Sequence, residues 1–462
     1  MLEKFHRKYI GDRNFYKRYI ALALPMIIQN AVTNLVSFLD NIMVGQLGTE
    51  QMSGVAIVNQ LIFVYNLAVF GAVSAASIFG AQYFGKGNHK GHMYSFRFKL
   101  YATLLVTGGA ILLFLTKGSA LISLYLTDTV GNGATDLALQ YGLEYLAIMM
   151  VGLIPFAVNQ SYATNIKETG QTFIPMLASF VAVGTNAILD YLMIFGIGPF
   201  PELGVQGAAL ATVIARYIEA LIVVIWAHIH RGKNRYLEGA YTGFGIPLAE
   251  LKAILIKGFP LMMNEVLWAA GMTTVTQCYS VRGLNVVAGL NIASTITNLF
   301  NIVYLQLGSC ISIVVGQYLG AGELEKAKDA DNKMIVFSVF CCVIVAVCML
   351  FMGRFFPQIY NTSEEIRALA TSFIAVSAII MPFCSFSHAS YFTLRSGGKT
   401  MVTFLFDSVF TWIIIVPIAF LLAHFTGLGI VSVYFLVQAT ELIKVVIGYF
   451  MVHSNVWLVQ MV

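Results

Sequence analysis

Charge is scarce in this chain: only 11% of its 462 residues are Asp, Glu, Lys or Arg, whereas 58% are hydrophobic. A soluble domain carries about 25% charged residues, so the composition excludes an ordinary soluble protein. Nearly charge-free stretches reach the roughly 20 residues that a helix needs to cross a bilayer, and they lack the ~10-residue alternation of barrel strands. The sequence therefore predicts an all-α integral membrane protein whose surroundings are the lipid bilayer.

Motifs for metal, nucleotide and nucleic-acid chemistry are also missing. The six cysteines lie in apolar runs without a CxxC, and the eight histidines form no HExxH or His/Cys cluster, so we expect no metal site. No GxxxxGK[ST] loop occurs, which argues against ATP as an energy source within this chain. A membrane-bound transferase would need a His/Asp cluster or a DxxD-like motif at a helix edge, and none is evident. We expect no cofactor, no enzymatic activity and no nucleic-acid partner.

Apolar runs give a span count of twelve. They lie near residues 19–43, 53–80, 98–127, 138–163, 171–197, 204–229, 251–279, 288–318, 335–357, 368–394, 400–424 and 427–452. The segments on the N-terminal side of the membrane carry 21 Lys and Arg residues, and those on the opposite side carry four. The positive-inside rule then places both termini in the cytoplasm of a multi-pass cell-membrane protein. Residues 1–18 are basic and are interpreted as a cytoplasmic membrane-surface segment, not a signal peptide.

The two halves of the chain repeat each other. "SAASIFGAQYFGKG" at 74–87 matches "SCISIVVGQYLGAG" at 309–322 at seven of fourteen positions, with an offset of 235 residues. The segment "NIKETGQT" at 165–172 resembles "TLRSGGKT" at 393–400, with an offset of 228. A duplicated six-helix unit inserts twice with the same orientation, so the halves are related by a pseudo-twofold axis along the membrane normal. This is the plan of rocking transporters, with the substrate path between two bundles.

The repeat also sets the expected domains. They are a first lobe at 19–230, a cytoplasmic linker at 231–250, a second lobe at 251–453 and a C-terminal tail at 454–462. Prolines at matching places in the two lobes predict kinks where bending could gate access, at Pro25, Pro155, Pro260 and Pro382.

Several motifs resemble the multidrug and toxic compound extrusion (MATE) transporters over roughly residues 20–450. They are "LPMIIQN" followed by "FLDNIMVGQLG", then "GAQYFGKGN", "GVQGAALAT" and "RSGGKT". The resemblance implies twelve helices in two lobes around a central cavity. It also implies efflux of organic cations or other toxic compounds in exchange for H⁺ or Na⁺. The wider group includes flippases for lipid-linked sugars.

Carboxylates inside apolar runs are the candidate ion-coupling residues. An ionised Asp at the centre of a membrane helix costs about 2.5–3.5 kcal/mol, and burial disfavours the charged form of a carboxyl. Asp40 fits such a role, although it lies toward the end of its helix and could instead be a wet helix-end residue. Asn186 and Asp190 are four residues apart and share one helical face. The resemblance joins these three in a first-lobe ion site, with Thr212 as a weaker member.

The second lobe holds further candidates. Its counterpart of Asp40 is Val275, so we infer that ion coupling lies chiefly in the first lobe. Glu265, five residues after Pro260, is a candidate for substrate binding or gating, or else a satisfied polar contact. Asp407 is a candidate of the same kind, with a bond to a neighbouring helix as the alternative. Asn159 is a polar residue predicted to line the cavity.

An ion-coupled exporter of small cationic molecules, functional as a monomer, is the favoured interpretation. A flippase for a lipid-linked precursor is the alternative, and it would need a strongly basic cavity to hold phosphate. Charge inside the spans is mainly acidic, which favours cationic cargo. The sequence leaves H⁺ and Na⁺ open, and we favour H⁺ because an Asp pair can titrate while nothing fixes a complete Na⁺ cage.

Overall fold

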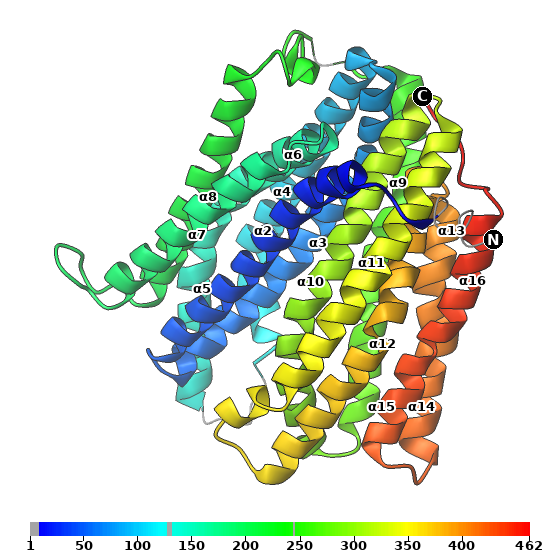
Figure 1. The fold of residues 1–462 in the computed structure, drawn as a ribbon. Helices are drawn as coiled ribbons and strands as arrows, with labels where there is room; N and C mark the ends of the chain where they lie inside the picture. Colours follow the sequence, from blue (N-terminus) through cyan, green and yellow to red (C-terminus); the bar gives the residue numbers. More distant parts are fainter. Residues whose placement is uncertain (1–8, 127–131, 244) are drawn as a thin grey trace. The chain divides into compact units, whose positions relative to one another are not determined.

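The computed structural model describes residues 9–126, 132–243 and 245–462, and its regular structure over these ranges is entirely helical. The α-helices follow one another along the chain (Figure 1) as α2 (Arg13–Gly45), α3 (Thr49–Lys86), α4 (His89–Ser123), α5 (Asn132–Val151), α6 (Leu153–Glu168), α7 (Phe173–Ile194), α8 (Val205–Ile229), α9 (Leu248–Ser280), α10 (Leu284–Gly320), α11 (Leu324–Gly353), α12 (Glu364–Ser396), α13 (Thr400–Phe404), α14 (Val416–Phe425), α15 (Ile430–Ala439) and α16 (Glu441–His453). Short 3₁₀ turns occur at Arg235–Leu237 and Phe356–Ile359, and π-helical turns at Leu405–Val409 and Thr411–Ile415.

The predicted membrane spans are confirmed. Within the described residues, eleven helical segments are long and apolar enough to cross a bilayer, and the count rises to twelve when one bent pair is taken as a single span. Helices are the natural form of these runs because a helix satisfies its backbone hydrogen bonds internally, without water. The run predicted at 400–424 is continuous but changes character, since two π-helical turns separate α13 from α14.

The bent pair is α5 and α6, which meet at Gly152 with an angle of 44°. Pro155 lies in the first turn of α6. Its ring clashes with the carbonyl of the residue four positions earlier and it has no N–H to donate, so the helix breaks there. This bend was predicted from the sequence. In contrast, α2, α9 and α12 continue as helices through Pro25, Pro260 and Pro382.

The chain divides into two compact units, and most of the division lies inside helices. Unit 1 consists of the described part of Met1–Ile27, Ala81–Asn88 and Ala253–Val462, and unit 2 consists of Ile28–Gly80 and His89–Lys252. The chain therefore passes from one unit to the other inside α2, inside α3, between α3 and α4, and near the start of α9. The lobe boundaries expected from the repeat remain a prediction.

Unit 1 is built around α12, which packs against α10, α11, α15 and α16. One apolar cluster joins residues of α9, α10, α12 and α14, and a second joins the start of α2 to the ends of α10, α12 and α16. The second cluster contains both Tyr19 and Trp457, so the start of α2 and the C-terminal tail lie at the same end of unit 1. This agrees with an even number of spans.

Unit 2 packs α8 against α5, α6 and α7, and α4 against α5 and α6. Its larger apolar cluster contains residues of α3, α5 and α8, and a smaller cluster lies where α4 and α8 meet the segment after α8. That segment is fixed by one side chain. Arg97 donates to the backbone carbonyl oxygens of Gly239, Ala240 and Gly245 at 2.7, 2.9 and 2.7 Å.

Candidate ion-binding site

The packing of α7 on α8 brings three of the predicted residues together in unit 2. Asn186 and Asp190 lie one turn apart on the face of α7 that is buried, with 9% and 1% of their surfaces exposed. The Asn186 Nδ2 donates to Thr212 Oγ1 on α8 at 3.4 Å, and Thr212 Oγ1 donates to the carbonyl oxygen of Ala208 at 3.0 Å. Asn186 also interacts with the Asp190 carboxylate through its side chain. The predicted spacing has therefore produced one polar cluster.

Asp40 joins this cluster from α2. It lies five residues before the end of that helix, is partly buried, and its carboxyl is close enough to Asp190 for direct electrostatic interaction. In each of the two acids, Oδ1 is buried without a hydrogen-bond partner. No ion pair shorter than 4.0 Å within the described part of the chain includes Asp40 or Asp190. Two neighbouring acids thus share a buried site without a permanent counter-charge.

This arrangement is chemically suited to taking up one cation. Two carboxylates that share a low-dielectric site repel each other, so at least one of them strongly favours a bound proton or another positive charge. The cost of an ionised acid in a membrane protein also falls when such a cation is present. The site can therefore exist in an occupied state and an empty state that differ by one unit of charge.

Tyr145 lies beside the two acids and connects them to Arg216, and sequence reasoning did not assign either residue a part in the site. Tyr145 on α5 is 1% exposed, donates from its hydroxyl to Asn59 Oδ1 at 3.3 Å, and interacts electrostatically with both acids and with Arg216. Arg216 on α8 donates to the carbonyl oxygen of Gly152 at 3.4 Å, and its guanidinium lies 5.2 Å from the ring centre of Phe156. The bend between α5 and α6 therefore provides an anchor for the arginine.

Asn159 lies in the same unit, on α6. It is 4% exposed, and its Oδ1 atom is buried without a hydrogen-bond partner. An amide oxygen of this kind is available to a ligand or a water molecule. The position of Asn159 on the transport path stays a prediction.

Asp407 and Glu265 lie in unit 1 and differ from each other. Asp407, on the first π-helical turn, accepts from Lys444 Nζ at 2.9 Å and from Asn264 Nδ2 at 3.1 Å. The contacts of Asp407 are those of a fixed ion pair. Glu265 on α9 is partly buried and interacts electrostatically with Asp407 and Arg395, and no ion pair within 4.0 Å joins it to Arg395 in the described chain.

A further ionic cluster in unit 2 was not predicted. Lys99 Nζ contacts Glu168 Oε1 at 2.5 Å and also Asn165 Oδ1, and His92 Nε2 lies 3.4 Å from Glu168 Oε2. All four side chains are at most 2% exposed. Lys99 and Glu168 lie 69 residues apart in sequence, on α4 and α6, so no local spacing could reveal their contact.

Comparison with known proteins supports one assignment. A family model described as MatE matches residues 25–192 and 260–421. The curated proteins to which the chain is similar include two bacterial proteins that are each named "probable multidrug resistance protein NorM". The Thermotoga maritima protein is 23% identical over 90% of this chain and 87% of its own length, and the Pseudomonas aeruginosa protein is 25% identical over 90% and 85%.

Solved structures agree at the level of the fold. A MOP superfamily transporter from Pyrococcus furiosus aligns with a TM-score of 0.85, at 20% identity over 96% of both chains. A structure described as the outward-facing conformation of a multidrug resistance MATE family transporter aligns with the same TM-score, at 21% identity over 96% of both chains. The predicted two-lobe helical fold is confirmed by these likenesses.

Proposed function

Because the chain belongs to the MatE family of multidrug and toxic compound extrusion transporters, we propose that it exports small organic cations in exchange for H⁺. The observation that carries this proposal is the pair of Asp40 and Asp190, two buried acids with no permanent counter-charge. Transport, not catalysis, is the activity of this family, so the alternative of a membrane-bound transferase is set aside.

The coupling mechanism follows from the charge of the acid pair. A cation entering from outside neutralises one charge and lowers the cost of burying the site in the low-dielectric interior. Its release toward the cytoplasm restores the charge, and this difference favours one state of the transporter over the other. The two states need only a few kcal/mol of difference for the bound ion to direct the cycle.

A proton is favoured over Na⁺ by the hydrogen bonds around the acids. A Na⁺ site would need several oxygen ligands directed at one point, as hard cations do in proteins. Asn186 presents its amide N–H groups to Thr212 and Asp190, and the Thr212 oxygen already accepts one hydrogen bond while donating to Ala208. These two side chains are therefore engaged with each other, whereas a proton requires only one carboxylate oxygen.

For the substrate path we propose Glu265 and Asn159, because each has polar capacity that no ion pair uses. Asp407 belongs to the same set of predictions, but its bond to Lys444 leaves it less able to bind a cation. Pro25 and Pro260 are proposed as points of bending. The division of α2 between the two units lies just two residues after Pro25.

The remaining assignments follow the distribution of basic residues and the family. We propose a multi-pass protein of the cell membrane with both termini in the cytoplasm, functional as a monomer. The two lobes would rock around a central cavity, so that the acid site reaches first one side of the membrane and then the other.

Ethidium efflux from inverted vesicles tests the proposal, with a pH gradient and a Na⁺ gradient imposed separately. Asp40→Asn and Asp190→Asn should each reduce proton-driven efflux to the level of vesicles without transporter. Glu364→Gln is the matched control, because Glu364 has an 89% exposed side chain at the start of α12. If both Asp variants exported ethidium like the unmodified protein under either gradient, the acids would not be the coupling site.

A further inference from the structure

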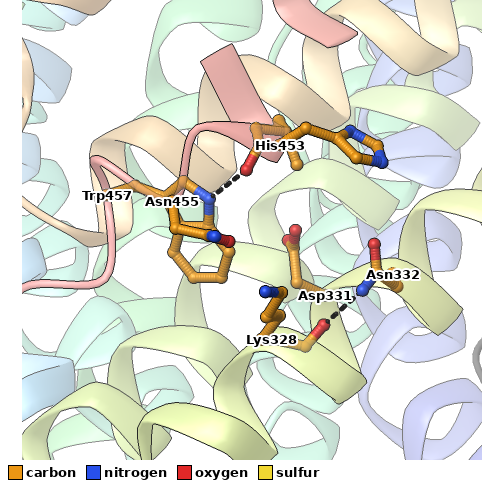
Figure 2. A pocket seen from close by; sticks show the side chains of 7 residues that line it. Lys328, Asp331, Asn332, His453, Asn455 and Trp457 are labelled. Carbon is orange, nitrogen blue, oxygen red and sulfur yellow. Dashed lines mark hydrogen bonds between the residues drawn. The ribbon is translucent and has the colours of Figure 1, made fainter. Parts of the chain in front are cut away.

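A polar pocket lies at the end of unit 1 where the first turns of α11 meet the last turn of α16. It has a volume of about 70 Å³ and is lined by Lys328, Asp331, Asn332, His453, Asn455 and Trp457 among others (Figure 2). One water molecule needs a volume of about 10–15 Å³ open to its centre, so the pocket has room for a few water molecules. Most of its lining side chains are polar or charged.

Asp331 is the unusual member of this lining. It is 1% exposed, its Oδ1 accepts from Thr393 Oγ1 at 2.5 Å, and its Oδ2 is buried without a hydrogen-bond partner. Figure 2 shows the carboxyl group extending from α11 into the space between Asn332 and Asn455. A buried charge with one unsatisfied oxygen is costly, and a carboxyl in this position commonly resolves the cost by binding a proton.

No group around Asp331 neutralises it permanently. Lys328, one turn earlier on α11, lines the same pocket, yet the ion pairs found among the described residues do not join the two. On α16, His453 Nδ1 is engaged with the Tyr449 carbonyl oxygen at 3.1 Å, and from α2 the phenol of Tyr19 interacts electrostatically with Asp331.

The element packed behind Asp331 offers no counter-charge either. From α12 it is Thr393 that reaches Asp331, while the guanidinium of Arg395, two residues on, lies 5.6 Å from the ring centre of Phe392. Two other buried acids in the described chain have a basic partner. Glu168 contacts Lys99 at 2.5 Å, and Asp407 contacts Lys444 at 2.9 Å.

The internal repeat sharpens this contrast. At the offset of 235 residues Asp331 corresponds to Phe96, and at the offset of 228 Thr393 corresponds to Asn165. In the first half, Asn165 accepts from Lys99 within a buried ionic cluster. The second half replaces this permanent pairing with a single acid that faces a polar pocket.

We propose that Asp331 is a second proton-binding site, on the side of unit 1 that holds the C-terminal tail, with Lys328 as its counter-charge after release. The reaction is a simple dissociation: the Asp331 carboxylic acid gives its proton to pocket water and becomes a carboxylate. The ammonium of Lys328 then compensates the new charge across the same pocket. A metal cation is disfavoured because that ammonium group would repel it, whereas a proton needs only the free Oδ2 atom.

Infrared difference spectroscopy on the purified full-length protein tests the site directly. Protonated carboxyl groups give a carbonyl band distinct from that of carboxylates, so a change from alkaline to acid buffer should reveal the Asp331 band. Asp331→Asn should remove that band, whereas Asp329→Asn should keep it, because Asp329 is half exposed and pairs with Lys333. An identical difference spectrum for Asp331→Asn and the unmodified protein would overturn the proposal.

A second measurement uses Trp457, which is 1% exposed and lines the pocket. With the other three tryptophans replaced by Phe, its fluorescence should titrate with pH. Lys328→Gln should move the midpoint upward by about 1 pH unit, since an opposite charge within about 4–6 Å favours a carboxylate by 1–3 units. His453→Gln should leave the midpoint in place. The proposal fails if Lys328→Gln leaves the midpoint unchanged, or if the titration vanishes in His453→Gln.

Changing the salt distinguishes a bound proton from a bound Na⁺. Replacing choline with Na⁺ at constant ionic strength should not shift the Trp457 midpoint, and a competitive shift would mean a Na⁺ site instead of a proton site. These measurements require no transport. Proton binding at Asp331 can therefore be supported even if the efflux test rules out Asp40 and Asp190 as the coupling site. It can also be refuted even if that test supports them.

Discussion

Replacing Lys444 by Met should lower the free energy of unfolding, because Asp407 then lies buried without a positive charge beside it. The side chains of Lys444 and Asp407 are 6% and 19% exposed, and the ammonium nitrogen lies 2.9 Å from the carboxylate oxygen. The variant leaves Asp407 without its cation, although Asn264 still donates to it at 3.1 Å. Breaking a buried pair in this way costs roughly 3–5 kcal/mol.

Proton binding gives an independent figure for the same cost. If the Lys444→Met protein folds only with Asp407 neutral, it must protonate an acid whose ordinary pKa is about 3.9. At pH 7 this requires about 4 kcal/mol, in agreement with the range for broken pairs. The unfolded chain holds the carboxylate ionised and the folded variant holds it protonated, so the variant's stability rises as pH falls. At about pH 5 the penalty should shrink to roughly 1.5 kcal/mol.

Thermal unfolding in detergent measures this penalty, with a thiol-reactive dye reporting exposure of the buried cysteines. An unfolding entropy of about 2.1 cal/mol/K per residue gives roughly 1 kcal/mol/K for the 462-residue chain. The midpoint of Lys444→Met should therefore fall by about 4 °C at pH 7 and by 1–2 °C at about pH 5. Adding Asp407→Asn to that variant should recover most of the loss.

The control is Lys326→Met, which removes an exposed pair whose lysine side chain is 66% exposed. Pairs of this kind contribute about 0–1 kcal/mol, so the midpoint should stay within about 1 °C. A Lys444→Met protein as stable as the unmodified one at pH 7, or one whose loss did not depend on pH, would refute the account of Asp407 as a charge held by Lys444.

Three further substitutions have expected outcomes. Arg97→Gln should free the segment at residues 239–245, because the guanidinium donates to three of its carbonyl oxygens at 2.7–2.9 Å, and limited trypsin digestion should then cut there faster. Gly320→Val should impair folding, since a Cβ atom there would lie 1.9 Å from the carbonyl oxygen of Gln82, and the yield of monodisperse protein measures it. Gly108→Ala, at a helical glycine with open space around it, should instead raise the unfolding midpoint by an amount equivalent to about 0.5–1 kcal/mol.

Periodicity and local spacing made much of the fold and of the candidate ion-binding cluster predictable. Long apolar runs can only be helices in lipid, which is why the spans were placed correctly. Asn186 and Asp190 share a buried face because four residues make about one helical turn. The break before Pro155 followed from the missing N–H and the ring clash.

Contacts between distant helices were not predictable in the same way. The partner of Asp407 lies 37 residues away on another helix, and Glu168 meets Lys99 across 69 residues. Such pairs depend on the rotation of each helix about its axis, and apolar composition does not determine that rotation in a chain that is hydrophobic on nearly every face. Asp331 was overlooked for this reason, since its charged neighbours resemble an ordinary solvated loop.

The passage of the chain between units inside α2 and α3 has a mechanical consequence. A loop between rigid bodies absorbs their displacement at little cost, whereas a continuous helix resists bending through its backbone hydrogen bonds. Any displacement of one unit against the other would therefore bend α2 near Ile27 and α3 near Gly80. Bending would store elastic energy in these two helices in one conformation and release it on return to the other. The stiffness of the two helices would therefore help to set the rate of the transport cycle.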